Sequence, residues 1–262
     1  MNGENSPLPL PSLELRRLVG PVEDVYFDNP DGNFIFPDIP VEMYDSVFDF
    51  GCGCGRLARQ LMQQRIPPKH YVGIDLHTGM IEWCKHNLGA RNPNFEFFHH
   101  DVFNAGLNPK GVDKTLPFPV TDGSITLFIA WSVFTHVVQS AAEFYMSELS
   151  RILRPGGLAC TTWFLFDKMY YPMMQDFQNA LFINDIDPTN AVIFDKEWLR
   201  RVTRQAGIRI CSVKAPAIRG FQWEIYLEKA TPWKEHVEFP DDIASPGINR
   251  PPLMPANADE IR

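Results

Sequence analysis

The middle of the chain alternates short apolar runs with stretches of helical spacing. Seven runs have the length of buried strands. They lie at 46–50, 71–75, 95–100, 124–131, 158–164, 209–213 and 222–227. Between them, apolar residues recur every three or four positions, as in Met80, Trp83, Cys84 and Leu88. Strands that alternate with helices are typical of a parallel sheet covered on both faces. The pattern therefore predicts a doubly wound α/β fold with a mostly parallel, seven-stranded sheet.

Four helices are expected between these strands. Ser140-Ala141-Ala142-Glu143 has the form of a capping box and predicts the start of the third helix. Pro155-Gly156-Gly157 should end that helix, and Asp195 should be the N-cap of the fourth. The expected helices cover about 56–64, 79–88, 140–153 and 196–206.

Composition divides the chain into three segments. Residues 1–45 hold nine acidic and two basic side chains, and residues 231–262 hold six and three, so the negative charge lies in the two flanks; the middle is +2, and the total is −8. We expect 1–45 to be either a lid or a disordered arm, and the proline-rich, acidic 231–262 to be an extended tail. The alternating pattern, and with it the domain, spans 46–230.

The charge and cysteine content exclude several classes. The nearly neutral domain has no dense cluster of Lys and Arg to neutralise phosphates, which disfavours a nucleic-acid partner. No apolar run reaches the roughly 20 residues that cross a bilayer, and the N-terminus lacks signal-peptide features, so we expect a cytoplasmic protein without a membrane span. Five cysteines do not form a disulfide framework, and Cys52-x-Cys54 lacks zinc spacing. No metal is expected.

The most informative chemistry lies between the first two strands. Three glycines alternate in Asp49-x-Gly51-x-Gly53-x-Gly55, and Asp75 ends the second run. Glycines permit a tight turn and a close ligand, and a carboxylate at the next strand end can accept both hydroxyls of a ribose, so a nucleoside cofactor is implied. A dinucleotide fingerprint would need a glycine in place of Arg56. We expect the missing side chains to leave a gap for a methionine-linked nucleoside, with no place for a diphosphate.

This pattern resembles that of the class I S-adenosylmethionine-dependent methyltransferases. A second match is Ser132-Val133-Phe134-Thr135-His136 ahead of a helix and the turn at 153–157, and together the matches span about 46–230. The segments 108–111 and 116–118 also look like a loop of bacterial members that modify glycans or secondary metabolites. The resemblance implies a Rossmann-like methyltransferase fold, S-adenosyl-L-methionine as cofactor, and a glycan or small-molecule acceptor.

The carboxyl ends of the parallel strands meet along one rim, which collects candidate cofactor ligands. Asp75, followed by Leu76, would accept from the ribose hydroxyls in charge-assisted bonds, unless it is a helix N-cap. Asp101 would accept from the adenine amino group while the backbone N–H of Val102 or Phe103 donates to the ring; otherwise Asp101 merely starts a loop.

The turn itself would hold the methionine end of the cofactor. Asp49 would organise the ammonium group, or else be a buried carboxylate bonded to backbone N–H groups. Trp131 would either offer its face to the sulfonium or pack in the core. The candidates in the turn are Asp49, Gly51, Cys52, Gly53 and Gly55.

A sulfonium methyl is already activated, so its transfer is an in-line displacement in which the protein aligns the reactants and excludes water. A general base is needed if the acceptor is a hydroxyl. His136 is the candidate base; alternatively it is bonded to backbone at a helix start. Tyr170 and Tyr171 are candidate walls of an acceptor pocket.

Three functions remain open at this stage. The favoured one is transfer of a methyl group to a hydroxyl of a glycan or small metabolite. A non-catalytic S-adenosylmethionine-binding module would show the same cofactor residues. A nicotinamide-dependent oxidoreductase would share the turn and Asp75, but it would need glycine at position 56 and a second, nicotinamide-binding half.

Overall fold

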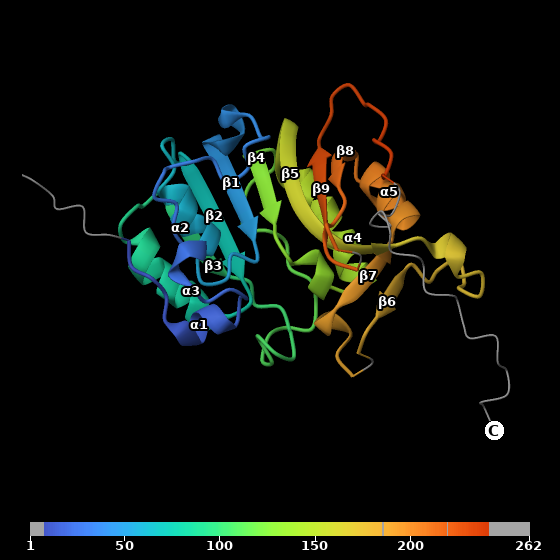
Figure 1. The fold of residues 1–262 in the computed structure, drawn as a ribbon, viewed down its shortest axis with the longest axis horizontal. Helices are drawn as coiled ribbons and strands as arrows, with labels where there is room; N and C mark the ends of the chain where they lie inside the picture. The colour runs from blue at the N-terminus through green and yellow to red at the C-terminus, as the bar shows by residue number, and fades with distance from the viewer. Residues whose placement is uncertain (1–7, 185, 219, 241–262) are drawn as a thin grey trace, which may run out of the picture.

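The computed structural model describes residues 8–184, 186–218 and 220–240. In this part of the chain nine strands form one mostly parallel sheet at the centre of the molecule (Figure 1). All seven expected strands are present, so the predicted fold is confirmed. The strands are β1 (Ser46–Phe50), β2 (His70–Asp75), β3 (Phe95–His99), β4 (Ile125–Ala130), β5 (Leu153–Phe166), β6 (Ala180–Phe182), β7 (Val192–Asp195), β8 (Arg209–Lys214) and β9 (Trp223–Glu228).

The first five strands lie in the order β3-β2-β1-β4-β5 and are all parallel. Beyond β5, β9 pairs antiparallel with residues 158–163, and β8 pairs antiparallel with β9. The order reverses between β1 and β4, and ligands of open α/β sheets bind outside the carboxyl ends of the strands at such a point.

Strand β5 is longer than expected at both ends. The preceding helix ends at Ile152, so the chain is already extended at Pro155-Gly156-Gly157 and these residues do not end the helix. At its other end, residues 164–166 pair with β7, which pairs antiparallel with β6. The β6–β7 hairpin was not predicted, because its strands have three and four residues and give little periodicity.

Helices cover both faces of the sheet, as expected for a doubly wound fold. Apolar side chains of α2 (Arg56–Met62) and α3 (Thr78–Cys84) belong to one buried cluster against the sheet, and those of α4 (Gln139–Ile152) and α5 (Lys196–Gln205) belong to another. The helices are α1 (Leu13–Arg17), α2 (Arg56–Met62), α3 (Thr78–Cys84), α4 (Gln139–Ile152) and α5 (Lys196–Gln205). Short turns are η1 (Asp24–Tyr26), η2 (Val41–Asp45), η3 (Lys85–Gly89), η4 (Phe134–His136), η5 (Lys168–Tyr170) and η6 (Pro188–Asn190).

One predicted helix start is confirmed and one is wrong. Asp195 caps α5 by accepting from the N–H of Trp198 at 3.0 Å. The capping box at Ser140 does not form, because α4 begins at Gln139 and its N-cap makes no side-chain bond. The Glu143 carboxylate that would complete the box instead accepts from the side chains of Gln139 and Trp198.

The described flanks pack against the domain. Residues 8–45 lie over α2 and the turn before it, and residues 231–240 lie beside β8, where the N–H of Val237 donates to the carbonyl of Ile210. The rest of the expected tail, 241–262, lies outside the described residues. In the described ranges no helix has the length and hydropathy to cross a bilayer, and no group of three or more His, Cys, Asp and Glu could hold a metal ion.

Candidate functional site

The turn after β1 is built from glycines with left-handed backbone angles. Gly51, Gly53 and Gly55 have φ of +82°, +55° and +78°, values that residues with a Cβ rarely adopt. The N–H groups of Gly51 and Cys52 both donate to the carbonyl of Ile74 on β2, at 2.8 and 2.9 Å. The turn is therefore fixed against the carboxyl end of β2.

Side chains of the protein fill the space beside these glycines. A Cβ on Gly51 would collide with Cγ2 of Val133, and one on Gly53 would lie 2.6 Å from Cγ1 of Val19. On Gly55 it would lie 2.7 Å from a leucine of η3. The expectation that the missing side chains leave a gap for the cofactor is therefore wrong. They instead make room for Val19 of the N-terminal arm and for Val133 of the segment after β4, so a cofactor at this turn would have both valines as neighbours.

Asp75 joins the glycine turn to the loop after β2. Its Oδ2 accepts from the N–H of Gly53 and its Oδ1 from the N–H of His77, both at 2.9 Å. Burial raises the pKa of Asp75, and the two backbone donors oppose that rise. His77 rather than Asp75 caps α3, so the alternative of a helix N-cap is wrong. Each carboxylate oxygen retains a lone pair that can accept from a ribose hydroxyl.

Leu76 and the two cysteines of the turn have structural contacts. The carbonyl of Leu76 lies 2.8 Å from Nε2 of His99, which fixes the loop after β2 to β3. Cys52 and Cys54 are both buried, and burial raises the pKa of both thiols, that of Cys54 to about 12. Protonated thiols of this kind are inert packing groups. The Cys52 side chain lies against Gly73 inside the sheet rather than at the rim.

Asp49 is buried beneath the turn. Its Oδ2 accepts from the hydroxyl of Tyr71 on β2 at 2.7 Å, and burial raises its pKa to about 7. Two interpretations were predicted for Asp49, an ammonium ligand and a carboxylate bonded to backbone. The observed partner is a tyrosine side chain, which neither interpretation included.

The prediction for the residues that would contact the adenine is partly wrong. Asp101 is exposed after β3, and its Oδ1 accepts from Nδ2 of Asn108 at 3.0 Å, so its other oxygen remains for a ligand. The backbone N–H of Val102 donates to the carbonyl of His100, and that of Phe103 to the carbonyl of a valine further along the loop. Neither N–H is therefore free to donate to an adenine ring as predicted. The loop folds back on itself and uses these donors internally.

The segment after β4 contains strained backbone that the sequence did not reveal. Trp131 packs against Phe36 of the arm with ring centroids 5.9 Å apart, which agrees with its packing interpretation. Ser132 has a φ of +60°, and non-glycine residues held in this region cluster at functional sites. Its N–H donates to Thr162, and its hydroxyl accepts from Gln222 at 2.9 Å. No sequence signal marks a serine for positive φ.

His136 lies at the end of η4, on the same rim. Its N–H donates to the carbonyl of Val133, and its Nδ1 lies 3.0 Å from the carbonyl oxygen of Thr189 in η6. The backbone contact predicted by its structural interpretation is thus present, while the exposed ring keeps Nε2 available. Tyr170 and Tyr171 are also exposed, in the segment after β5.

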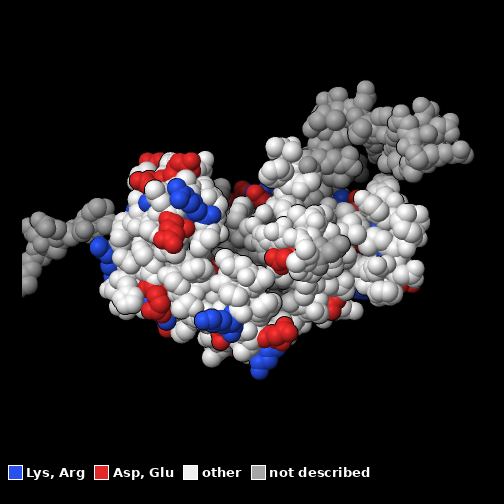
Figure 2. All heavy atoms as spheres, turned by 90° about the horizontal axis from the view of Figure 1, so that it is seen from below, with Lys and Arg blue, Asp and Glu red and all other residues white. Residues whose placement is uncertain are grey.

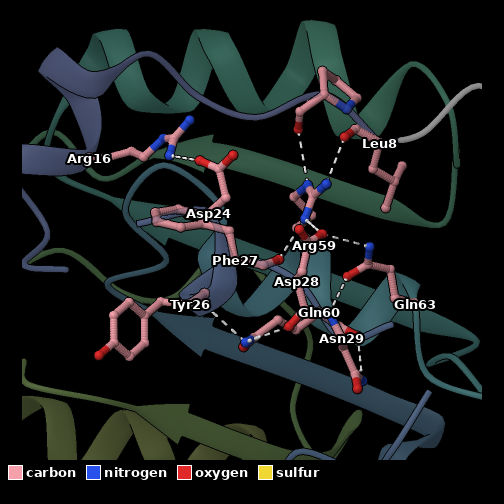
Figure 3. Close-up of polar contacts among 11 residues, drawn as sticks. Leu8, Arg16, Asp24, Tyr26, Phe27, Asp28, Asn29, Arg59, Gln60 and Gln63 are labelled. Atoms are coloured by element: carbon pink, nitrogen blue, oxygen red, sulfur yellow. Dashed lines mark hydrogen bonds and ion pairs between the residues drawn. The ribbon is translucent and has the colours of Figure 1, made fainter. Parts of the chain in front are cut away.

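A buried arginine of α2, together with Gln60 and Gln63, holds the N-terminal arm on the domain (Figure 3). Arg59 donates to the carbonyls of Leu8, Pro9 and Phe27 and forms an ion pair with Asp28. The arm also contributes Val19 to a small apolar cluster with Cys54 and Met80 over the glycine turn. Residues 8–45 are thus an arm packed over the turn, not a disordered one. No sequence pattern indicated this role of Arg59, because an arginine within a helix normally faces water.

The rim beyond the strand ends is sparsely charged. Strands β1 and β4 point downward in Figure 1, and Figure 2 shows the molecule from that side. Lys and Arg side chains appear singly on this face, among uncharged atoms and next to Asp and Glu. Hydrogen-bond acceptors such as the carboxylates of Asp75 and Asp101 suit the hydroxyl and amino groups of an adenosyl cofactor better than they suit a diphosphate.

Comparison with known proteins agrees with this arrangement. Residues 47–157 match the family model of the methyltransferase domain. The chain is 26% identical over 113 residues to tRNA N(3)-cytidine methyltransferase of Gallus gallus, and 27% identical over 124 residues to mRNA cap guanine-N(7) methyltransferase 1 of Arabidopsis thaliana. These matches cover 43% and 44% of this chain but 28% and 31% of the relatives, so the chain spans less than a third of their length.

A structure shows the same fold over a larger part of the chain. A SAM-dependent methyltransferase from Aquifex aeolicus is 14% identical, with a TM-score of 0.51, and the match covers 82% of this chain and 96% of that one. The matched domain, the sheet order and the glycine turn with Asp75 agree with the resemblance found in the sequence. The methyltransferase domain matched over residues 47–157 and the shared fold support a class I S-adenosylmethionine-dependent methyltransferase, with S-adenosyl-L-methionine as the cofactor.

Proposed function

We propose that the protein transfers a methyl group from S-adenosyl-L-methionine to a hydroxyl of a small, largely uncharged acceptor, a metabolite or a glycan. The main support is the character of the loops after β3 and β5, which follow strand ends at the rim. They expose large apolar side chains and few cations, whereas a polyanionic acceptor needs several cations. The exposed side chains of these loops include Phe103, Leu107, Tyr170, Tyr171, Met173 and Phe177, and Phe182 and Ile183 at the end of β6 are exposed as well.

In this proposal, different residues of the rim contact different parts of the cofactor. Asp75 accepts from the ribose hydroxyls, Asp101 accepts from the adenine amino group through its unpaired oxygen, and the glycine turn lies beside the methionine end. Asp49, below the turn, supports it through Tyr71 without direct contact. The cofactor supplies an activated methyl group, and the chain aligns the acceptor with it and excludes water.

His136 is the proposed general base. Its Nδ1 is bonded to a backbone carbonyl, so Nε2 is the ring nitrogen that can receive a proton from the acceptor hydroxyl. The ring is exposed at the end of η4, in the segment that follows β4, at the rim where the acceptor would approach.

We assign the arm, residues 1–45, as a lid over the cofactor, 46–230 as the methyltransferase domain and 231–262 as a tail. The contact of Val19 with Gly53 supports the lid, because it places an arm side chain directly on the turn that would face the methionine end. A lid of this kind excludes water during transfer and must move for the cofactor to exchange. Localisation in the cytoplasm stays a prediction.

A nucleic-acid base is the second candidate acceptor, because both curated relatives named above act on RNA. The decisive experiment measures transfer of labelled methyl from S-adenosyl-L-methionine to a panel of hydroxylated metabolites, glycans, tRNA and capped mRNA. Transfer to a metabolite or glycan supports the proposal, and transfer to RNA alone overturns the proposed class of acceptor. Binding of S-adenosylhomocysteine without any transfer would favour the non-catalytic module, and binding of NAD in its place would favour the oxidoreductase.

A further inference from the structure

The imidazole of His136 is oriented by a segment distant from it in sequence. Its Nδ1 lies 3.0 Å from the carbonyl oxygen of Thr189, in the connection between β6 and β7. A carbonyl accepts and does not donate, so Nδ1 carries the proton in this pair. The lone pair of the neutral ring is then on Nε2.

Thr189 is itself fixed by two side chains. Oδ1 of Asp187 accepts from the Thr189 N–H at 3.1 Å and from the Thr189 hydroxyl at 2.6 Å. Nδ2 of Asn104 donates to the same hydroxyl at 3.2 Å. The hydroxyl is donor and acceptor at once, so its rotation is restricted. The Thr189 carbonyl therefore has a defined position in front of His136.

These contacts join three loops of the rim. Asn104 belongs to the loop after β3, His136 follows β4, and residues 187–189 belong to the β6–β7 connection. The loop of Asn104 also contains Asp101, whose carboxylate it fixes through Asn108. The orientation of the imidazole is thus coupled to the loop that contains the proposed adenine ligand.

We propose that Thr189 and Asp187 are positioning residues for methyl transfer, which hold His136 in the tautomer protonated at Nδ1. This inference rests on the proposed function. In the transfer step the acceptor oxygen forms a bond to the methyl carbon, and the carbon–sulfur bond breaks with its electron pair remaining on sulfur. The hydroxyl proton moves to Nε2 of His136. In the other tautomer the ring would present an N–H to the hydroxyl and could not take its proton.

The tautomer can be measured without turnover. Nitrogen-15 NMR of the full chain at a pH where the ring is neutral should show His136 protonated at Nδ1. Thr189→Val and Asp187→Ala should move it toward the Nε2–H form. Thr121→Val, an exposed threonine before β4, is the matched control and should leave the signal unchanged. A wild-type ring protonated at Nε2 overturns the proposal whatever the activity.

Kinetics test the catalytic part. Thr189→Val and Asp187→Ala should lower kcat roughly tenfold or more while the Kd for S-adenosylhomocysteine stays within about twofold. Adding His136→Ala to Thr189→Val should give the loss of His136→Ala alone, because both changes act on one proton transfer. Thr189→Val keeps the shape of the side chain and the carbonyl that faces His136 and removes only the hydroxyl. The test therefore does not depend on whether Asp187→Ala folds. An unchanged kcat in Thr189→Val overturns the inference. A wild-type protein that methylates no acceptor overturns the proposed function instead, and the tautomer measured by NMR remains valid.

Discussion

The backbone N–H of Gly53 donates to Oδ2 of Asp75 at 2.9 Å, so the turn after β1 and the carboxylate that ends β2 hold each other in place. The carboxylate that we assign to the ribose is also part of the framework of the turn. A change at Asp75 should therefore affect both cofactor binding and the conformation of the glycines.

Asp75→Ala should weaken the binding of S-adenosylhomocysteine by about 1–3 kcal/mol, the range for a lost charge-assisted pair. Isothermal titration calorimetry measures the affinity directly. Glu96→Ala removes an exposed carboxylate from the neighbouring strand and should leave the affinity unchanged. Equal affinities for Asp75→Ala and wild type would remove Asp75 from the cofactor site.

Asp49 should make stability decrease as the pH rises. Its pKa is about 7 in the folded chain against an ordinary 3.8, so between these values the folded state holds a proton that the unfolded state has released. The free energy of unfolding should therefore fall by up to about 1.4 kcal/mol per pH unit through that window.

Asp49→Asn isolates this contribution, because an amide oxygen can still accept from Tyr71 and does not titrate. Urea unfolding of both proteins between pH 4 and pH 8 gives the difference curve. His100, whose burial lowers its pKa to about 4, changes stability in the opposite direction, but it is present in both proteins and cancels. Parallel curves for the two proteins would show that Asp49 is ionised throughout.

The contact between Val19 and Gly53 predicts a rescue. Gly53→Ala should destabilise the protein both through positive φ, which costs roughly 1–2 kcal/mol, and through collision of the new Cβ with Val19. Val19→Ala in the same chain should remove the collision and leave the backbone cost. Thermal unfolding of the two single variants and the double variant measures the coupling, and strictly additive effects would argue against the contact.

Arg59 should decide whether the arm stays on the domain. Arg59→Met retains the aliphatic stem but leaves three carbonyls without their donor and Asp28 with only the side-chain amide of Gln63, which should cost about 3 kcal/mol. Hydrogen exchange should show lost protection in residues 8–28 while β1 stays protected. Arg65→Met removes an exposed arginine that donates to Asn33 and lies over the ring of Phe34, outside residues 8–28, and it should change stability by less than about 0.5 kcal/mol. Equal protection of the arm in both variants would contradict this role.

His136→Ala should lower turnover by roughly a hundredfold or more, as expected for a lost general base, without changing cofactor affinity. His86→Ala is the matched control, since this exposed histidine of η3 lies on a helix away from the strand ends. Full activity of His136→Ala would return His136 to a structural role.

Features that depend on local patterning were predictable from sequence. The strands, the N-cap at Asp195 and the position of Asp75 follow from periodicity, capping chemistry and glycine conformation. The capping box failed because Glu143 has a better partner in Trp198, which is distant in sequence.

Features that depend on tertiary contacts were not predictable. Val19 and Val133 reach the glycine turn from segments that no local pattern connects to it. The same holds for Thr189, which reaches His136 across 53 positions of sequence. The donors of Val102 and Phe103 were misassigned because a loop that bonds to itself leaves no periodic signal.

The extension of β5 has a consequence for how this chain can diversify. Residues 164–166 continue past the last pair with β9 and support the whole hairpin that contains Thr189. An insertion attached to one strand end can be lengthened, shortened or exchanged without altering the sheet order or the turn at Gly51–Gly55. Because Thr189 also bonds to Asn104, a change in this hairpin would reach both the proposed base and the loop of Asp101, while the turn at Gly51–Gly55 would keep its own contacts.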